Sequence, residues 1–274
     1  MEELGYSLES YKLILSTFQS SGFQIVPLRA PVADEDASVL YLRHDVDYNL
    51  EVAERMAEAN QELGVSGCFF VNPRCPLYNV ACEDSLGSVA RIRALGQTIG
   101  LHVTLLGDEV ESIVHDADRI ARYVQREHNL LSSIVGEVEP VMSWHNPSLA
   151  GEHFQDRLCN EIRGIFNAYS LSHRGVAYMG DTNHRYSTAQ WLDAARSGQG
   201  SIQATFHPYT WVLGAPTMEE TLARTWPLLI RRCEKEFMSN HTYRAACPDG
   251  LPAEALSRWV DPLYRSALTR DRAV

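Results

Sequence analysis

The chain has 274 residues, 45% of them hydrophobic and 22% charged, so it can bury a sizeable core. Its formal net charge of −11 comes without a basic cluster, which argues against a nucleic-acid-binding protein, because neutralising phosphates takes clustered Lys and Arg. The N-terminus lacks the features of a signal peptide and no apolar run is long enough to span a bilayer, so we expect a cytoplasmic protein without a membrane partner.

Short apolar runs alternate along the chain with longer segments that carry one apolar face. The predicted strands, in chain order, are residues 38–46, 65–72, 98–104, 140–148, 164–170, 176–181 and 201–209. The predicted helices are residues 49–64, 83–96, 108–131 and 187–198, and a long helix that begins near residue 217. Ser187 is the expected cap of one of these helices. This alternation predicts an α/β fold with a mainly parallel sheet.

No linker, internal repeat or low-complexity tract divides the chain, and we therefore expect a single domain over residues 1–274. Within it, residues 1–38 are predicted to form a helical appendage before the first main strand. Residues 39–240 are predicted to form the α/β body, and residues 241–274 a C-terminal extension.

Ionisable side chains stand at the C-terminal ends of several predicted strands. In parallel α/β folds these ends form one face, and active sites lie there. The side chains concerned are Asp45, Asp47, His102, His145, Asp181 and His207. They come from distant parts of the sequence, and we predict that they converge on one site.

The run RHDVD, residues 43–47, places Asp45 and Asp47 two positions apart, on the same side of a strand. Two nearby carboxylates repel each other unless a cation binds one or a proton stays on the other. The arrangement suits a base beside a metal ligand. The alternative is that one Asp caps the following helix and the other lies in a loop. For His102 alone, the alternative is a core histidine whose hydrogen bonds are satisfied.

Five segments, in the order LRHDVD, IGLHVT, SWHNPS, YMGDTNHRY and TFHPYTW, resemble the polysaccharide deacetylase (NodB-homology) family. The resemblance is to a divergent branch with an R-H-D-V-D first motif, and it covers roughly residues 41–212. It implies a distorted or incomplete (β/α) barrel. It also implies a hydrolase that removes N-acetyl, and sometimes O-acetyl, groups from sugars with one divalent metal ion.

Carried over to this sequence, the resemblance makes Asp45 the general base and Asp47 a metal ligand. His102 becomes a second ligand, and His207 the acid that protonates the leaving amine. Asp181 could orient His207, because catalytic histidines need a carboxylate or carbonyl partner. A role for Asp181 in a turn is an equal alternative.

The chain departs from the family where a second ligand histidine, four residues after the first, is replaced by Leu106. His145 is our candidate for the third ligand, because its segment is expected to reach the same face. One Asp and two neutral His suit Zn²⁺ best, with Fe²⁺, Co²⁺ and Ni²⁺ as alternatives. The family's third-motif Arg has no evident counterpart, and Arg43 and Arg185 are candidates. The predicted substrate contacts are His44, Arg43, Tyr209, Trp211 and Arg185.

We therefore predict a metal-dependent N-deacetylase that acts on a small acylated amino sugar or glycoconjugate. Both a monomer and a homo-oligomer are compatible with the sequence. A second prediction is hydrolysis of another non-peptide C–N bond, in a formamide or a cyclic ureide. A third is a catalytically inactive binding protein of the same fold. Leu106 favours this third prediction, and the presence of Asp45, Asp47 and His207 together opposes it.

Overall fold

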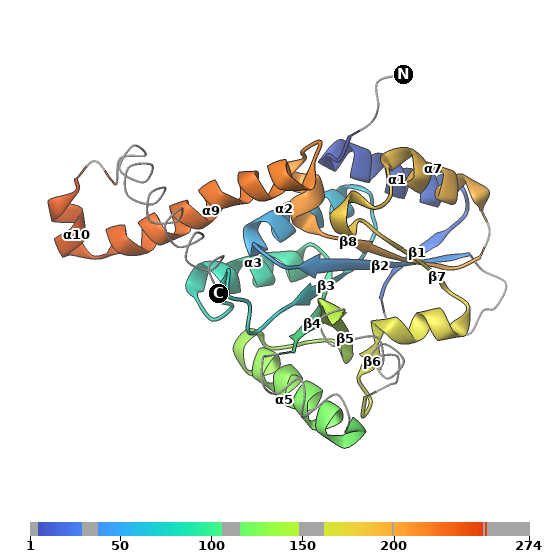
Figure 1. Cartoon of the computed structure of the whole chain (residues 1–274), viewed down its shortest axis with the longest axis horizontal. Coiled ribbons are helices and arrows are strands. Elements are labelled where there is room, and N and C mark those ends of the chain that lie inside the picture. The colour runs from blue at the N-terminus through green and yellow to red at the C-terminus, as the bar shows by residue number, and fades with distance from the viewer. Residues whose placement is uncertain are drawn as a thin grey trace, which may run out of the picture. The chain divides into compact units, whose positions relative to one another are not determined.

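The computed structural model describes residues 5–28, 38–105, 116–147, 162–198, 200–248 and 250. The chain divides into two compact units, Met1–Leu222 and Ala223–Val274. The first unit contains a parallel β-sheet and the helices that cover it (Figure 1). The second contains most of α9 (Met218–Ser239) and all of α10 (His241–Ala246). The domain limits suggested by the sequence remain a prediction.

The sheet has eight strands, and all of its neighbouring strands run parallel. The strands are β1 (Gln24–Pro27), β2 (Val39–Val46), β3 (Cys68–Val71), β4 (Thr98–Thr104), β5 (Val141–His145), β6 (Phe166–Asn167), β7 (Ala177–Gly180) and β8 (Ile202–Phe206). Their order is β6-β5-β4-β3-β2-β8-β7, and β1 also pairs with β2. The two ends of this order, β6 and β7, do not pair among the described residues. The sheet is thus a half-barrel, which confirms the predicted incomplete (β/α) barrel.

Helices follow the strands as the sequence predicts. In the first unit they are α1 (Leu8–Ser20), α2 (Leu50–Glu62), α3 (Glu83–Ala94), α5 (Ala117–Val135), α7 (Thr188–Ser197), α8 (Pro208–Leu213) and the 3₁₀ turns η3 (Ala168–Arg174) and η4 (Thr182–His184). The predicted Ser187 cap of α7 is confirmed as a capping box with Gln190. Asn49 caps α2 by accepting hydrogen bonds from two backbone N–H groups. No helix in the described part of the chain could cross a membrane.

The strand β2 lies at the centre of the sheet, between β3 and β8, and all eight of its residues are buried. Strands covered on both faces are usually apolar throughout. Here the second half of the strand carries Arg43, His44 and Asp45. Since side chains alternate along a strand, Arg43 and Asp45 share one face and His44 occupies the other.

On its own face, His44 belongs to a chain of buried hydrogen bonds that joins β2 to α1, to α2 and to the residue before β4. Its Nε2 lies 2.8 Å from the hydroxyl of Tyr11 on α1, which donates to Oδ1 of Asn60 on α2. Asn60 in turn donates to Gln97, just before β4. Burial lowers the pKa of His44 to about 3, so the ring is neutral at physiological pH. His44 thus ties helices to the sheet, away from the strand-end residues.

Residues from the predicted appendage form part of the main core. On α1, the side chains of Tyr11, Ile14, Leu15 and Phe18 are 0% exposed. The strand β1, which the sequence did not reveal, pairs with β2. In Figure 1, α1 lies beside α7, in agreement with the contacts between these helices.

Three predicted elements differ from the structure. The strand expected over 201–209 ends at Phe206, because Pro208 takes the first position of the helix α8. The strand expected over 164–170 has only the two residues of β6, because the Asn167 side chain accepts a hydrogen bond from the Tyr169 N–H and starts η3. Of the helix expected over 108–131, residues 108–115 lie outside the described residues, and the described part forms α5, which runs from Ala117 to Val135. Leu106 lies outside the described residues.

The contribution of α1 to the core can be measured. Leu15→Ala deletes a fully buried side chain and is expected to lower the free energy of unfolding by about 2–5 kcal/mol. Leu13→Ala alters the same helix at a side chain that is 43% exposed and should change it by less than about 0.5 kcal/mol. Urea denaturation followed by circular dichroism measures both. Equal, small effects would show that α1 is not part of the cooperative core.

Candidate active site

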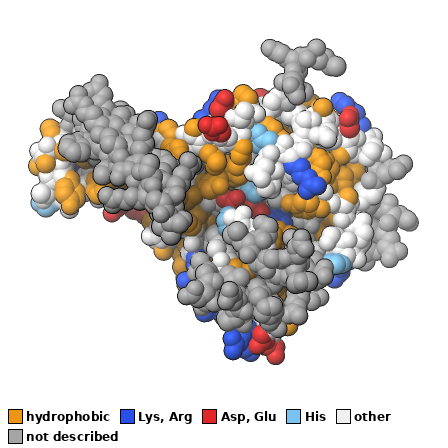
Figure 2. Space-filling model, viewed as in Figure 1, with side chains coloured by type: hydrophobic (Ala, Val, Ile, Leu, Met, Phe, Trp, Pro, Cys, Tyr) orange, Lys and Arg blue, Asp and Glu red, His pale blue; other side chains and the backbone are white. Residues whose placement is uncertain are grey.

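The strand-end residues converge, as the sequence predicts. A cavity of about 420 Å³ opens over the C-terminal ends of the strands, and five of the six side chains line it. These are Asp45, Asp47, His102, His145 and His207. The sixth, Asp181, is fully buried behind His207. Figure 2 shows the face of the molecule that is hollowed here, with acidic and histidine side chains inside the hollow.

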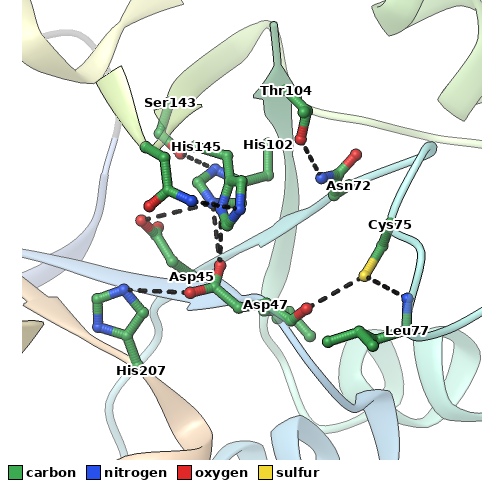
Figure 3. Close-up of polar contacts among 12 residues, drawn as sticks. Asp45, Asp47, Asn72, Cys75, Leu77, His102, Thr104, Ser143, His145 and His207 are labelled. Carbon is green, nitrogen blue, oxygen red and sulfur yellow. Dashed lines mark hydrogen bonds and ion pairs between the residues drawn. The ribbon is translucent and has the colours of Figure 1, made fainter. Parts of the chain in front are cut away.

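Three of these side chains bring their ligand atoms close together (Figure 3). Oδ1 of Asp47 lies 3.2 Å from Nε2 of His102 and 3.3 Å from Nδ1 of His145. The two imidazole nitrogens are themselves 3.3 Å apart. Ligand atoms about 2.0–2.1 Å from a tetrahedral ion lie about 3.3 Å from one another. The donor types and their separations therefore fit one divalent metal ion held by Asp47, His102 and His145.

The second nitrogen of each histidine also has a partner. Nδ1 of His102 lies 2.7 Å from the buried hydroxyl of Ser143, and Nε2 of His145 lies 3.0 Å from the Asn146 side-chain amide. Such contacts orient a ligand histidine and select which nitrogen faces the metal. The sequence analysis missed both partners, although Ser143 is directly opposite His102 in the β4–β5 register.

The contacts of Asp47 shift its own pKa and that of His145. Burial would raise the pKa of Asp47, but hydrogen bonds with His102 and His145 lower it overall. Burial would likewise lower the pKa of His145, but its hydrogen bond with Asp47 raises it. Asp47 is therefore an ionised carboxylate, as a metal ligand must be.

Asp45 has a different partner, which lies on its own strand. The Arg43 guanidinium donates two hydrogen bonds to it, from Nε to Oδ1 at 2.7 Å and from Nη2 to Oδ2 at 2.6 Å. Burial would raise the pKa of Asp45, but the charge of Arg43 lowers it overall. Arg43 lines the cavity but is only 2% exposed, and its guanidinium is committed to Asp45.

His207 is paired with Asp181. Its Nδ1 lies 2.5 Å from Oδ1 of Asp181, whose other oxygen accepts hydrogen bonds from the His207 backbone N–H and the Trp211 indole. Burial would lower the pKa of His207, but the charge and hydrogen bond of Asp181 raise it to about 10. The Nε2 atom of this imidazolium faces the cavity, 3.6 Å from Oδ2 of Asp47.

The loop after β3 supports the end of β2. The Tyr78 hydroxyl donates to the carbonyl of Val46, and the Cys75 thiol donates to the carbonyl of Asp47. Asn72 donates from its side chain to Thr104, two residues after His102 (Figure 3). These contacts hold the backbone on either side of the candidate metal site. No local sequence pattern predicts them.

The predicted substrate contacts divide into two groups. Tyr209 and Arg185 line the cavity together with Arg43. His44 and Trp211 are fully buried and do not line it, because His44 is on the opposite face of β2 and Trp211 packs behind Asp181. The cavity also contains side chains that the sequence did not single out, namely Tyr48, Tyr169, Tyr178 and Asn183.

No protein-family model and no curated protein matches the chain. Similar solved structures include a Bdellovibrio bacteriovorus peptidoglycan deacetylase, with 19% identity and a TM-score of 0.42 over 77% of this chain and 52% of that one. The chain thus spans about half the length of that protein. A Streptococcus mutans CE4 esterase has 14% identity and a TM-score of 0.42, over 85% of this chain and 89% of that one. A Bacillus anthracis CE4-family pseudoenzyme has 13% identity and a TM-score of 0.39, over 72% and 62%.

The Asp181–His207 pair predicts a pH dependence for the metal-free protein. Asp181→Asn should shift the pKa of His207 from about 10 towards its ordinary value of 6.5. Because the folded state raises this pKa, the pair stabilises the fold fully below pH 6.5, and the stabilisation is lost as the pH rises through 10. The wild type should therefore lose stability relative to Asp181→Asn across this interval. An NMR titration, with His207→Gln to identify the resonance, measures the pKa, and a wild-type value near 6.5 would contradict the assignment.

Proposed function

We propose that the protein is a metal-dependent hydrolase that removes an acetyl or similar acyl group from the nitrogen of a small amino sugar or glycoconjugate. The observation that carries the proposal is the spacing of Asp47, His102 and His145, whose three ligand atoms lie 3.2–3.3 Å apart. A carboxylate base and an imidazolium acid stand beside them in the same cavity. The motif resemblance of residues 41–212 supports the same reaction.

Asp47, His102 and His145 would hold the ion. One carboxylate and two imidazoles suit Zn²⁺, and also Fe²⁺, Co²⁺ or Ni²⁺. When bound, such an ion lowers the pKa of water and polarises an acyl carbonyl. In this assignment His145 supplies the third ligand that the family's pattern leads one to expect at position 106.

The other two charged groups have protonation states suited to opposite tasks. Arg43 keeps Asp45 ionised, so Asp45 can accept a proton from an attacking water molecule. Asp181 keeps His207 protonated, so its Nε2 can give a proton to the leaving nitrogen. Pairs of groups whose pKa values are driven apart in this way are typical of acid–base catalysis.

Of the two candidates for the counterpart of the family's third-motif arginine, the contacts of Arg43 favour Arg43. Its two hydrogen bonds fix both oxygens of Asp45, which orients the base as well as keeping it ionised. A third bond, from Nη1 to the side-chain oxygen of Gln203 at 3.0 Å, holds the guanidinium itself, in the Gln203 orientation that satisfies both ends of the amide. We therefore assign Arg43 to positioning rather than to substrate binding.

The cavity favours a small substrate. Its volume of about 420 Å³ is in the range of small-molecule sites. Tyr209 and Tyr48 stand at its wall with their rings 4.6 Å apart, and such rings can pack against a sugar. The net charge of −11 is consistent with a partner other than nucleic acid.

The ligand role of Asp47 and the base role of Asp45 predict different effects of mutation on metal binding and on acetate release. Asp47→Ala should abolish both metal binding and acetate release, because it removes the carboxylate shared by both histidines. Asp45→Asn should keep about one metal ion per chain and lower kcat by about 10²–10⁴-fold. Elemental analysis and an acetate assay measure the two properties. Full metal occupancy in Asp47→Ala would contradict the ligand assignment.

The positioning task of Arg43 predicts a pH effect. Arg43→Lys keeps a positive charge but loses the two-bond geometry, so the pKa of Asp45 should rise. The acidic limb of the kcat profile should then move to higher pH, and kcat should fall by about tenfold or more, with metal content unchanged. A profile identical to that of the wild type would show that Arg43 does not act through Asp45.

Chelation separates this reaction from the alternatives. Removing the metal should abolish hydrolysis, and adding Zn²⁺ or Co²⁺ should restore it. Measuring acetate and formate from a panel of acyl donors distinguishes a deacetylase from a hydrolase of another C–N bond. A protein that takes up metal but hydrolyses none of these donors would be a binding protein.

A further inference from the structure

The structure assigns to Arg185 the recognition of an anionic substituent, a phosphate or a carboxylate, on the substrate. This inference rests on the proposed function, which it narrows from acylated amino sugars in general to those that carry an acidic group. Its basis is the turn that follows β7. Three residues of that turn, Thr182, Asn183 and Arg185, line the cavity, whereas His184 between them does not.

The turn has an unusual backbone. Asn183 and His184 both have φ near 54°, in the left-handed region that residues other than glycine adopt rarely. Such conformations persist only where the surrounding structure fixes them, and they are concentrated at functional sites. Here the two successive left-handed residues lie where the turn divides: His184 is half-buried and does not line the cavity, whereas Thr182, Asn183 and Arg185 do.

The N-terminal segment holds the turn in place. The Tyr6 ring stacks on the His184 imidazole with 3.9 Å between ring centroids, and the Tyr6 hydroxyl donates to the carbonyl of Tyr186. At the start of the turn, the Asp181 carboxylate is fixed by three hydrogen bonds from His207 and Trp211. The turn is therefore anchored on both sides of Arg185.

Arg185 differs from the other basic side chains that line the cavity. Arg43 is paired with Asp45, His207 with Asp181, and His102 and His145 with Asp47. The Arg185 side chain is exposed, lies 5.4 Å from the centroid of the Tyr186 ring, and has no carboxylate within 4.0 Å in the described part of the chain. A cation without a partner at the rim, in a protein of net charge −11, is suited to an anion brought by the ligand.

The neighbouring side chains add neutral hydrogen-bonding groups. Thr182 has a hydroxyl and Asn183 an amide, and both are exposed at the same rim. A planar guanidinium beside such groups matches the oxygens of a phosphate or a carboxylate, to which it can donate two hydrogen bonds. The acyl group would then lie towards Asp45 and the acidic substituent towards Arg185.

The test uses three probes: a neutral N-acetylated hexosamine, its phosphate ester, and the corresponding carboxylate-bearing uronic acid. Binding is measured by calorimetry on the metal-free full chain, and acetate release on the metal-loaded protein. Wild type should bind at least one anionic probe about tenfold or more tightly than the neutral one, and the preference should weaken as salt is added. The two anionic arms show whether phosphate or carboxylate is preferred.

Arg185→Gln should remove this preference without changing binding of the neutral probe, and Arg185→Lys should keep part of it. Arg174→Gln is a matched control, because Arg174 is also exposed, lies 5.7 Å from the Phe166 ring centroid, and does not line the cavity. The control should behave as the wild type.

The outcomes separate the two proposals. An anion preference that depends on Arg185, without acetate release, supports this inference and overturns the proposed reaction. Acetate release from all three probes at similar kcat/KM, unchanged in Arg185→Gln, supports the reaction and overturns this inference. An equal loss of binding for all probes in Arg185→Gln, or the absence of binding by any probe in the wild type, also overturns it.

Discussion

The carboxylate of Asp47 faces the imidazole rings of His102, His145 and His207 at 3.2, 3.3 and 3.6 Å, and the rest of the site is arranged around that charge. In the proposed reaction, His102 and His145 would have to be neutral to act as ligands, whereas His207 would have to keep its proton to act as an acid. The structure distinguishes them by their second partners. Ser143 offers a neutral hydroxyl to His102, and Asp181 offers a full negative charge to His207.

The two carboxylates of the RHDVD run, Asp45 and Asp47, are likewise distinguished by their partners. They lie two positions apart, Asp45 on β2 and Asp47 directly after its end, yet each has its own compensating groups. Arg43 neutralises Asp45 by a salt bridge within the protein, which leaves Asp47 as the carboxylate that would bind the proposed ion. A buried charge without a partner is costly, so these separate partners explain how two acids can stand at and just after the end of a central strand.

Much of this could be predicted from the sequence, because strand-end residues and side-chain alternation are local properties. The strand over 98–104 matches β4, and the residues expected to converge do line one cavity or support it. Alternation could also have shown that His44 points away from Asp45. The missing parts depend on contacts between distant segments. The pairing of β1 with β2, the support of Val46 by Tyr78 and the anchoring of the 181–186 turn by Tyr6 have no local signature.

The pairing of Arg43 with Asp45 has a consequence for the order in which the site assembles. Two residues on one strand meet as soon as that strand forms, since almost no loop has to close. His102 comes from 55 residues beyond Asp47, and His145 from a further 43, so the three ligand atoms meet only after β3, β4 and β5 have joined β2. A metal ion would bind tightly only to chains in which this half of the sheet is complete. Metal binding would therefore stabilise only the fully folded state. It would slow the unfolding of this half of the sheet, in which the pairing of strands distant in sequence is intrinsically slow to form.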